Sequence, residues 1–153
     1  MILTGSWRRR ARSGMIVFID TNVIIDFLLK REPFCEAAAE ILQRCAGREL
    51  TGYLAFHSIP DIGYILRKVP ENKRRGWLKD ICSILFVAAA SHEEVVKAVE
   101  NEAFADFEDC LQDRCAKSKD ARYIITRNVK DFDRAEVPAV TPQEFLAIME
   151  SEK

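Results

Sequence analysis

Residues 15–22 hold an apolar run that ends at an acid. The strand-like part, residues 16–19, is Ile-Val-Phe-Ile, and Asp20, Thr21 and Asn22 follow it directly. Residues 23–29 are again mostly apolar, as expected of a short helix packed on a sheet. The run therefore predicts a buried strand that leads into a helix through a polar corner. In open α/β sheets the carboxyl ends of parallel strands form the crevice where ligands bind, so we expect Asp20 to face a site.

The rest of the chain repeats this alternation of short strands and helices. Strands are predicted at residues 16–19, 51–56, 85–89, 123–126 and 138–140. Helices are predicted at residues 22–29, 36–46, 61–68, 72–84, 92–101, 107–117 and 141–149. Short apolar strands between helices are typical of a parallel sheet covered on both faces. The sequence thus predicts an α/β fold, a three-layer α/β/α sandwich around a five-stranded sheet.

Local signals predict how several helices begin, end and pack. Gly47 stands where a helix commonly ends, and Ser58 is placed to cap the helix at residues 61–68. Thr141 begins a capping box followed by proline. The valines at positions 95, 96 and 99 have helical spacing and are predicted to form the core face of their helix.

Length and charge limit the classes of protein to consider. The chain has 153 residues, enough for one compact domain and too few for two of ordinary size. Its formal net charge is −1, but the stretch before Met15 contains arginines and no acid, which leaves the body mildly acidic. These arginines are Arg8, Arg9, Arg10 and Arg12. An acidic body repels phosphates at long range, so a nucleic acid would be bound through a local basic patch or metal ions.

The chain divides into residues 1–14 and a single domain at residues 15–153. The first segment lacks the apolar stretch of a secretory signal, and we interpret it as a mobile basic extension; an arginine arm that touches nucleic acid is the alternative. Five cysteines without a CxxC spacing, and two distant histidines, favour free thiols in a reducing cytoplasm over a zinc site. No apolar run approaches the roughly 20 residues needed to span a membrane.

Acids and amides gather at the predicted strand ends and first helical turns. The groups are Asp20 with Asn22, Asp61, Asp106 with Asp109, and Asn128 with Asp131. The carboxyl ends of parallel strands meet at one edge of a sheet, so four carboxylates are expected to share a small volume. Two like charges about 4 Å apart repel by roughly 4 kcal/mol at an effective dielectric constant near 20. A divalent cation removes that repulsion, and oxygen ligands favour Mg²⁺ or Mn²⁺. The pattern indicates metal-assisted phosphodiester hydrolysis.

Each of these acids also has a purely structural interpretation. Asp61, Asp106 and Asp109 are each placed to cap a helix, and Asp131 could serve a turn. Asp26, in mid-helix, is expected to be either solvent-facing or salt-bridged. The one basic concentration in the body is either a solvated helix face or a rim that contacts RNA phosphates. Its residues are Arg67, Lys68, Arg74 and Arg75.

Four stretches resemble the ordered motifs of PIN-domain proteins, a family that includes the VapC-type ribonuclease toxins. They are residues 19–26, Asp61 with residues 64–68, residues 106–109 and residues 123–132. The resemblance implies a three-layer fold, Mg²⁺- or Mn²⁺-dependent endoribonuclease activity on RNA, homodimers and a small antitoxin partner.

By this resemblance, Asp20 and Asp109 are the metal ligands, and Asp61 and Asp131 complete the catalytic set. Supporting positions around them are Thr21, Asn22, Asp106, Thr126 and Asn128. Two positions depart from the family pattern: Asp61 stands where many members have glutamate, and Asn128 where many have an acid. A degenerate PIN module that binds RNA or a protein is therefore the alternative. A weaker one is an aspartyl-phosphate phosphatase, in which Asn22 would replace the second aspartate.

Overall fold

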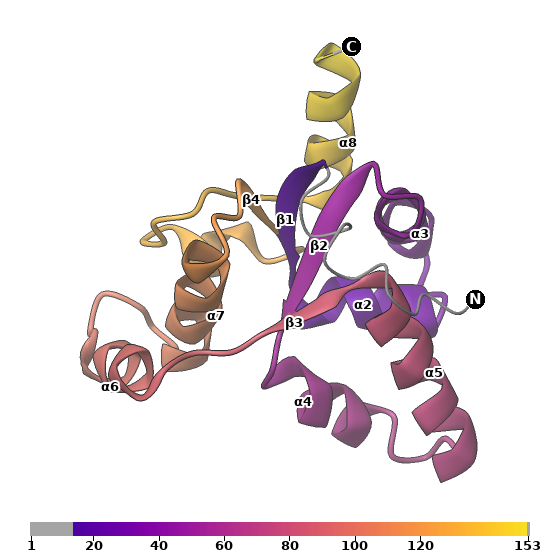
Figure 1. Cartoon of the computed structure of the whole chain (residues 1–153), viewed down its shortest axis with the longest axis horizontal. Coiled ribbons are helices and arrows are strands. Elements are labelled where there is room, and N and C mark those ends of the chain that lie inside the picture. Colours follow the sequence, from indigo (N-terminus) through magenta and orange to yellow (C-terminus); the bar gives the residue numbers. More distant parts are fainter. Residues whose placement is uncertain (1–13, 153) are drawn as a thin grey trace.

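The structure, a computed structural model, describes residues 14–152 and contains a five-stranded parallel sheet (Figure 1). The strands are β1 (Met15–Ile19), β2 (Leu50–Ala55), β3 (Phe86–Ala88), β4 (Tyr123–Ile125) and β5 (Ala139–Val140). Their order across the sheet is β3-β2-β1-β4-β5, and all neighbouring strands are parallel. The predicted fold class is confirmed. The interpretation of the basic extension, Gly14 apart, concerns residues that lie outside the described range.

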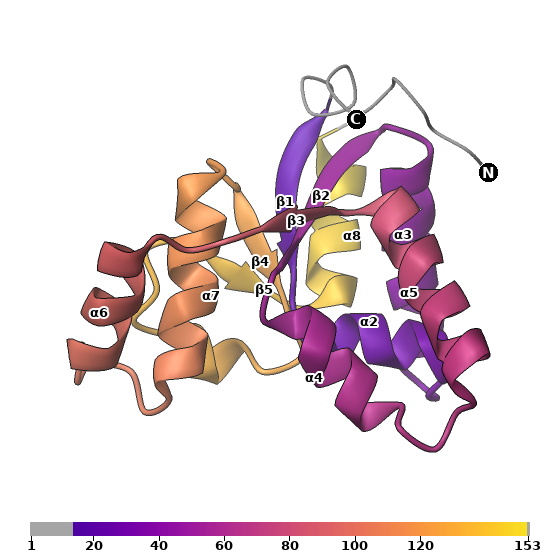
Figure 2. The ribbon, with the colours of Figure 1, turned by 60° about the horizontal axis from the view of Figure 1, so that its bottom comes forward.

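Helices cover both faces of the sheet, with α7 and α6 on one side and α2, α3, α5 and α8 on the other (Figures 1 and 2). All the predicted helices are present, with ends displaced by at most a few residues. They are α2 (Thr21–Leu28), α3 (Cys35–Ala46), α4 (Ser58–Ile65), α5 (Glu71–Ile84), α6 (His92–Glu100), α7 (Phe107–Ser118) and α8 (Pro142–Ser151). A 3₁₀ helix, η1 (Val129–Phe132), follows β4.

Strand β1 lies at the centre of the sheet and contributes to both cores. Val17 and Ile19 pack into the larger core, under α3 and α8, while Phe18 packs against α7 on the opposite face. This alternation follows from the two-residue period of a strand. Gly52 on β2 lets α3 approach closely, because a Cβ there would lie 2.8 Å from the sulfur of Cys45. Residues 17–19 of this strand are therefore fully buried at the centre of the fold.

Helices α2, α3 and α7 end in the same kind of left-handed turn. Lys30, Arg48 and Asp120, each two residues beyond the last helical residue, have φ angles of 52°, 69° and 56°. At each turn two backbone N–H groups bond back to helical carbonyls, as in a Schellman motif. Gly47 follows the last residue of α3, as predicted, but it keeps a φ of −80°. Arg48 instead takes the left-handed conformation of this turn. A residue with a side chain therefore bears the left-handed strain at each end.

Two local predictions are wrong. Ser58 does not cap α4 from outside: the helix begins at Ser58, whose buried hydroxyl accepts a hydrogen bond from Thr21. The valines of α6 do not form a core face, since Val99 is 60% exposed and only Ala98 of this helix is buried. The reason is that α6 packs on α7 and not on the sheet, so a single side chain makes the buried contact.

The remaining global predictions concern thiols and membranes. The structure contains the five cysteines as thiols and not as disulfides, as predicted. Between residues 14 and 152 no helix is long and apolar enough to cross a bilayer.

Candidate functional site

The carboxyl ends of β1, β2 and β4 lie at one end of the sheet, where α2 and α4 leave β1 and β2 (Figure 2). A cavity of about 280 Å³ opens there. Six residues predicted for the site line it: Asp20, Thr21, Asn22, Asp61, Asp109 and Asn128. Positions far apart in the sequence are thus brought together as the topology requires.

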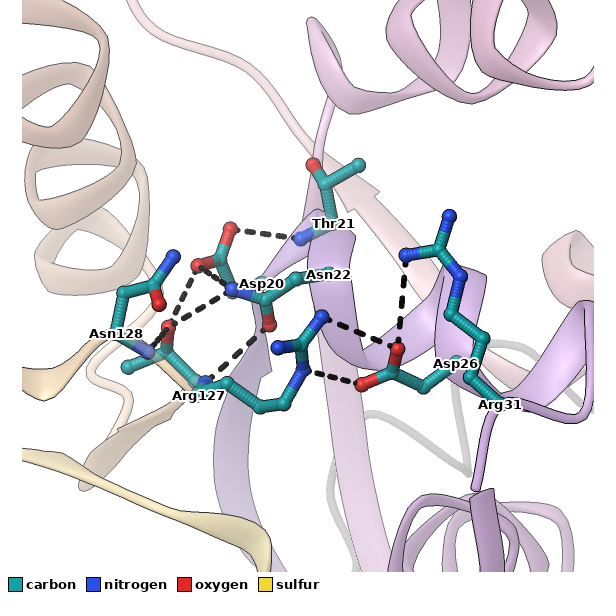
Figure 3. A network of polar contacts seen from close by, with 8 residues as sticks. Asp20, Thr21, Asn22, Asp26, Arg31, Arg127 and Asn128 are labelled. Atoms are coloured by element: carbon teal, nitrogen blue, oxygen red, sulfur yellow. Dashed lines mark hydrogen bonds and ion pairs between the residues drawn. The ribbon is translucent and has the colours of Figure 1, made fainter. Parts of the chain in front are cut away.

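Asp20 is held by four donors, none of which is charged. Its Oδ1 accepts hydrogen bonds from the backbone N–H of Thr21 at 2.7 Å and from Nε2 of Gln112 at 2.8 Å. Its Oδ2 accepts from the hydroxyl of Thr126 at 2.7 Å and from Nδ2 of Asn22 at 3.2 Å (Figure 3). Only 7% of Asp20 is exposed. The carboxylate is therefore fixed in orientation, while its negative charge is not balanced by these partners.

The backbone of Asp20 is fixed as well. Its N–H donates to the carbonyl of Ile125 at 3.0 Å, which continues the pairing of β1 with β4 by one residue. Its φ and ψ of −71° and 152° make it the N-cap of α2. An aspartate at the end of this strand is thus held by the sheet and the helix together.

The side chains around Asp20 connect three elements. The hydroxyl of Thr21 donates to Ser58 at 2.7 Å and ties α2 to α4. Asn22 Oδ1 accepts from the backbone N–H of Arg127 at 3.3 Å, and Thr126 Oγ1 accepts from that of Asn128 at 3.0 Å. These bonds hold the corner after β4 against the corner after β1.

Asp109 lies in the first turn of α7 and carries the most perturbed carboxyl group of the site. Its pKa is raised to about 7, first because partial burial disfavours the charged form. Next come the negative charges of Asp131, Asp106, Asp20 and Glu108. Crowding of unbalanced negative charge is the condition that a bound cation relieves.

The aspartates predicted to lie together are divided between two cavities. Asp20, Asp61 and Asp109 line the first. Asp106 and Asp131 line a neighbouring cavity of about 510 Å³, and Asp109 borders both. Asp106 also caps α7, because its Oδ1 accepts from the N–H of Glu108 at 2.9 Å. The structural interpretation of Asp106 is therefore correct.

The predicted basic rim does not line the cavity. Arg67 and Lys68 border a separate hollow, and the Arg67 guanidinium stacks 4.3 Å from the ring centre of Tyr64. Arg74 donates to a backbone carbonyl of α4, and Arg75 pairs with an acid of its own helix.

Four polar residues of the cavity wall were not predicted: Arg31, His57, Glu108 and Gln112. Gln112 follows Asp109 by three positions, so the helical period places both on one face of α7 and could have indicated it. Within residues 14–152, His57 Nε2 and Gln112 Oε1 are the buried side-chain atoms that lack a hydrogen-bond partner. Both belong to this cavity wall, which indicates that the wall is built to meet a further polar group.

The oxygen atoms that line the cavity suit a hard cation. No three Asp, Glu, His or Cys side chains in the described part of the chain form a metal-binding cluster. The carboxylates of Asp20 and Asp109 line the cavity, and Oε1 of Gln112 is a further oxygen of its wall, without a hydrogen-bond partner. Mg²⁺ is commonly held by one or two carboxylates and several waters. The residues therefore fit Mg²⁺ or Mn²⁺.

Asp26, six residues after Asp20, is buried and salt-bridged. Its Oδ2 lies 2.6 Å from Nε of Arg127, and its Oδ1 lies 3.8 Å from a terminal nitrogen of Arg31 (Figure 3). The Arg127 guanidinium also stacks 4.2 Å from the ring centre of Phe34. Of the two alternatives for Asp26, the salt bridge is correct and solvent exposure is wrong.

Comparisons with known proteins agree with this architecture. A family model described as PIN domain matches residues 16–130. No curated protein sequence matches the chain. One solved structure with a similar fold is the crystal structure of VapBC2 from Rickettsia felis bound to a DNA fragment from their promoter. That similarity has a TM-score of 0.64 at 18% sequence identity and covers 83% of this chain and 98% of that chain.

Proposed function

Because the chain belongs to the PIN-domain family, whose members are generally nucleases, we propose that it is a divalent-cation-dependent endoribonuclease that hydrolyses RNA phosphodiester bonds. One observation carries the proposal: Asp109 shares a cavity with Asp20, and its pKa is raised to about 7 by burial and by neighbouring carboxylates. Acids crowded in this way repel one another, and a bound cation would relieve that repulsion.

The acids of the cavity have distinct roles in this proposal. Asp20 and Asp109 hold the cation, and the four hydrogen bonds that Asp20 accepts fix the orientation of its carboxylate. Asp61, exposed on the first turn of α4, orients water from another part of the wall. When bound, Mg²⁺ or Mn²⁺ polarises the phosphate and lowers the pKa of a water it holds. Asn128 lines the same cavity as Asp20, and Asp131 lines the neighbouring cavity that Asp109 also borders.

The cellular role we propose is that of a toxin in a toxin–antitoxin pair. Support comes from the resemblance of the motifs to VapC-type toxins and from the similarity of the fold to VapBC2. A small antitoxin protein, a homodimeric state and a cytoplasmic location belong to the same proposal.

The proposal is tested by RNA cleavage. A labelled pool of structured RNAs is incubated with the purified chain in Mn²⁺, in Mg²⁺ and in EDTA, beside Asp20→Asn and a control, Asp80→Asn, which changes an exposed acid outside the cavity. We expect cleavage that requires metal, is lost in Asp20→Asn and persists in Asp80→Asn. Cleavage that is equal in EDTA, or undiminished in Asp20→Asn, contradicts the proposal.

A second candidate is a PIN module that binds RNA without cutting it. Asn128 at the fourth motif and the lack of a three-acid cluster within residues 14–152 favour it. Calorimetric titration with Mn²⁺ separates the two candidates. Metal binding linked to cleavage supports the nuclease, whereas RNA binding with neither metal binding nor cleavage supports the module.

A further inference from the structure

Arg31 brings positive charge to the acidic cavity. Among the described residues that line it, Arg31 alone carries a guanidinium or ammonium group. The other charged side chains of the wall are the carboxylates of Asp20, Asp61, Glu108 and Asp109. A polyanionic substrate entering this cavity would meet repulsion from the wall everywhere except at Arg31 and at a bound cation.

The turn after α2 explains why Arg31 reaches the cavity. Lys30 takes a left-handed φ of 52°, and its N–H donates to the carbonyl of Phe27 at 3.3 Å. The N–H of Arg31 donates to the carbonyl of Asp26 at 3.0 Å, and its own carbonyl accepts from Cys35 at 2.7 Å. The chain thus folds back along α2, with the backbone of Arg31 fixed beside Asp26.

Two arginines share the single carboxylate of Asp26, and they do so unequally. Arg127 bonds to both oxygens, at 2.6 Å and 3.2 Å, and its side chain is 27% exposed. Arg31 lies 3.8 Å from one oxygen, and its side chain is 44% exposed. Arg127 alone balances the charge of Asp26, so the positive charge of Arg31 is surplus to the pair. Long, exposed ion pairs contribute little to stability, so the Arg31 guanidinium is free to pair with another anion.

We propose that Arg31 binds a phosphate group of the RNA substrate at the cavity, while Asp26 remains paired with Arg127. The proposal rests on the proposed nuclease function and assigns to Arg31 the phosphate contact first sought in the basic rim. A guanidinium presents two parallel N–H donors to phosphate oxygens, which gives geometric selectivity as well as charge. Arg31 is then a substrate-binding residue, and Arg127 supports the fold.

The test separates substrate binding from stability. Binding of a fluorescent single-stranded RNA is measured in EDTA, so that no divalent cation contributes, over a series of KCl concentrations for the wild type, Arg31→Gln and Arg31→Lys. The control is Arg122→Gln, which removes an exposed arginine paired with Glu152 just before β4, at the opposite end of the sheet. The thermal unfolding midpoint is measured for each variant, and cleavage kinetics are measured in Mn²⁺.

For Arg31→Gln we expect RNA binding to weaken about tenfold, and the slope of log K against log salt to fall by about 0.7, as for one lost phosphate contact on a single strand. KM should rise with little change in kcat, because the contact forms in the ground state. Arg31→Lys should keep the salt slope but recover only part of the affinity. The unfolding midpoints of both variants, and the RNA affinity of Arg122→Gln, should match the wild type.

Three outcomes overturn the inference. If the wild type cleaves RNA and Arg31→Gln binds with unchanged affinity and slope, Arg31 is not a phosphate contact, and the nuclease proposal stands. If weaker binding comes with an equally lowered unfolding midpoint, and Arg31→Lys does not restore it, the role of Arg31 is structural. If the wild type neither binds nor cleaves RNA, the nuclease proposal itself fails, and the inference fails with it.

Discussion

Asp20 caps the short helix α2 and Asp26 lies within it, and both are buried, with exposed fractions of 7% and 1%. The groups that contact their carboxylates differ in charge. Asp20 accepts hydrogen bonds from a backbone N–H, a hydroxyl and two side-chain amides, whereas Asp26 pairs with the guanidinium groups of Arg127 and Arg31 (Figure 3). Burial alone therefore does not distinguish the carboxylate that we propose as a metal ligand from the salt-bridged one. The charge of the hydrogen-bond donors does distinguish them.

The physical basis is charge balance. Neutral donors stabilise the ionised form of Asp20 but leave its negative charge to act on the cavity. Arg127 cancels the charge of Asp26 locally, and the pair then serves to join the end of α2 to the corner after β4. Removing one partner of such a buried pair leaves an uncompensated charge, which costs several kcal/mol.

The largest expected effect is on activity, through Asp20. Asp20→Asn removes one of the two proposed charged ligands, so Mn²⁺ binding and RNA cleavage should each fall at least about a hundredfold. The unfolding midpoint should change little, because asparagine can still cap α2 and accept some of the same hydrogen bonds. Calorimetry, cleavage and thermal unfolding check these three expectations together. A large fall in the unfolding midpoint of Asp20→Asn would mean that Asp20, like Asp26, mainly stabilises the fold.

The next effect is on stability, through Asp26. Asp26→Asn leaves the half-buried Arg127 without a counter-charge, and we expect the free energy of unfolding to fall by about 3 kcal/mol. Urea denaturation measures this loss. Mn²⁺ binding by the folded fraction should remain within about twofold of the wild type, and a variant that keeps full stability but loses the metal would reverse the assignment of the two aspartates.

The sequence predicted the place of Asp20 at a site edge but left two alternatives open for Asp26, and the reason is the range of the interactions. An acid at the end of an apolar strand indicates a site edge by local pattern alone. The partners that define the chemistry are remote: Gln112 lies 92 positions from Asp20, and Arg127 lies 101 positions from Asp26. For Asp26 the local pattern allowed exposure or a salt bridge, and only the folded chain could select one.

The same limit explains the misplaced valine face of α6 and the missed wall residues. A helical period shows which residues share a face, but not whether that face meets the sheet, another helix or solvent. In α6 the neighbour is α7, which covers only Ala98. Arg31 was missed because the turn that places it at the cavity has a left-handed residue, Lys30. Such turns are usually predicted from glycine, and lysine does not indicate one.

A smaller effect is expected from pH, through Asp109. Its carboxyl pKa is raised from 3.8 to about 7 in the folded chain, chiefly by burial, so the folded state holds a proton that the unfolded state releases between these values. The contribution of Asp109 to stability is therefore favourable at low pH and is lost as the pH rises toward about 7. In metal-free buffer at pH 8, Asp109→Asn should unfold roughly 3 °C higher than the wild type, with the difference vanishing near pH 4.

Mn²⁺ sharpens this measurement. At pH 8 Asp109 is mostly ionised, and a cation bound by Asp109 would balance its charge, so saturating Mn²⁺ should stabilise the wild type and leave Asp109→Asn nearly unchanged. Thermal unfolding with and without Mn²⁺ at pH 4 and pH 8 supplies four values for each protein. If the metal stabilises both proteins equally, Asp109 is not a ligand, and the cation site must be sought around Asp20 without it.

The smallest effect concerns the turn that places Arg31 beside Asp26. Lys30 adopts a left-handed conformation that disfavours side chains by about 1 kcal/mol, whereas glycine adopts it freely but gains disorder in the unfolded chain. The two terms nearly offset, so Lys30→Gly should raise the free energy of unfolding by about 0.5 kcal/mol, measured in urea. The turn itself is held by backbone bonds from residues 30 and 31, which the substitution leaves in place. RNA affinity should therefore match the wild type. Reduced affinity at unchanged stability would mean that the charge of Lys30, and not only that of Arg31, contributes to substrate binding beside α2.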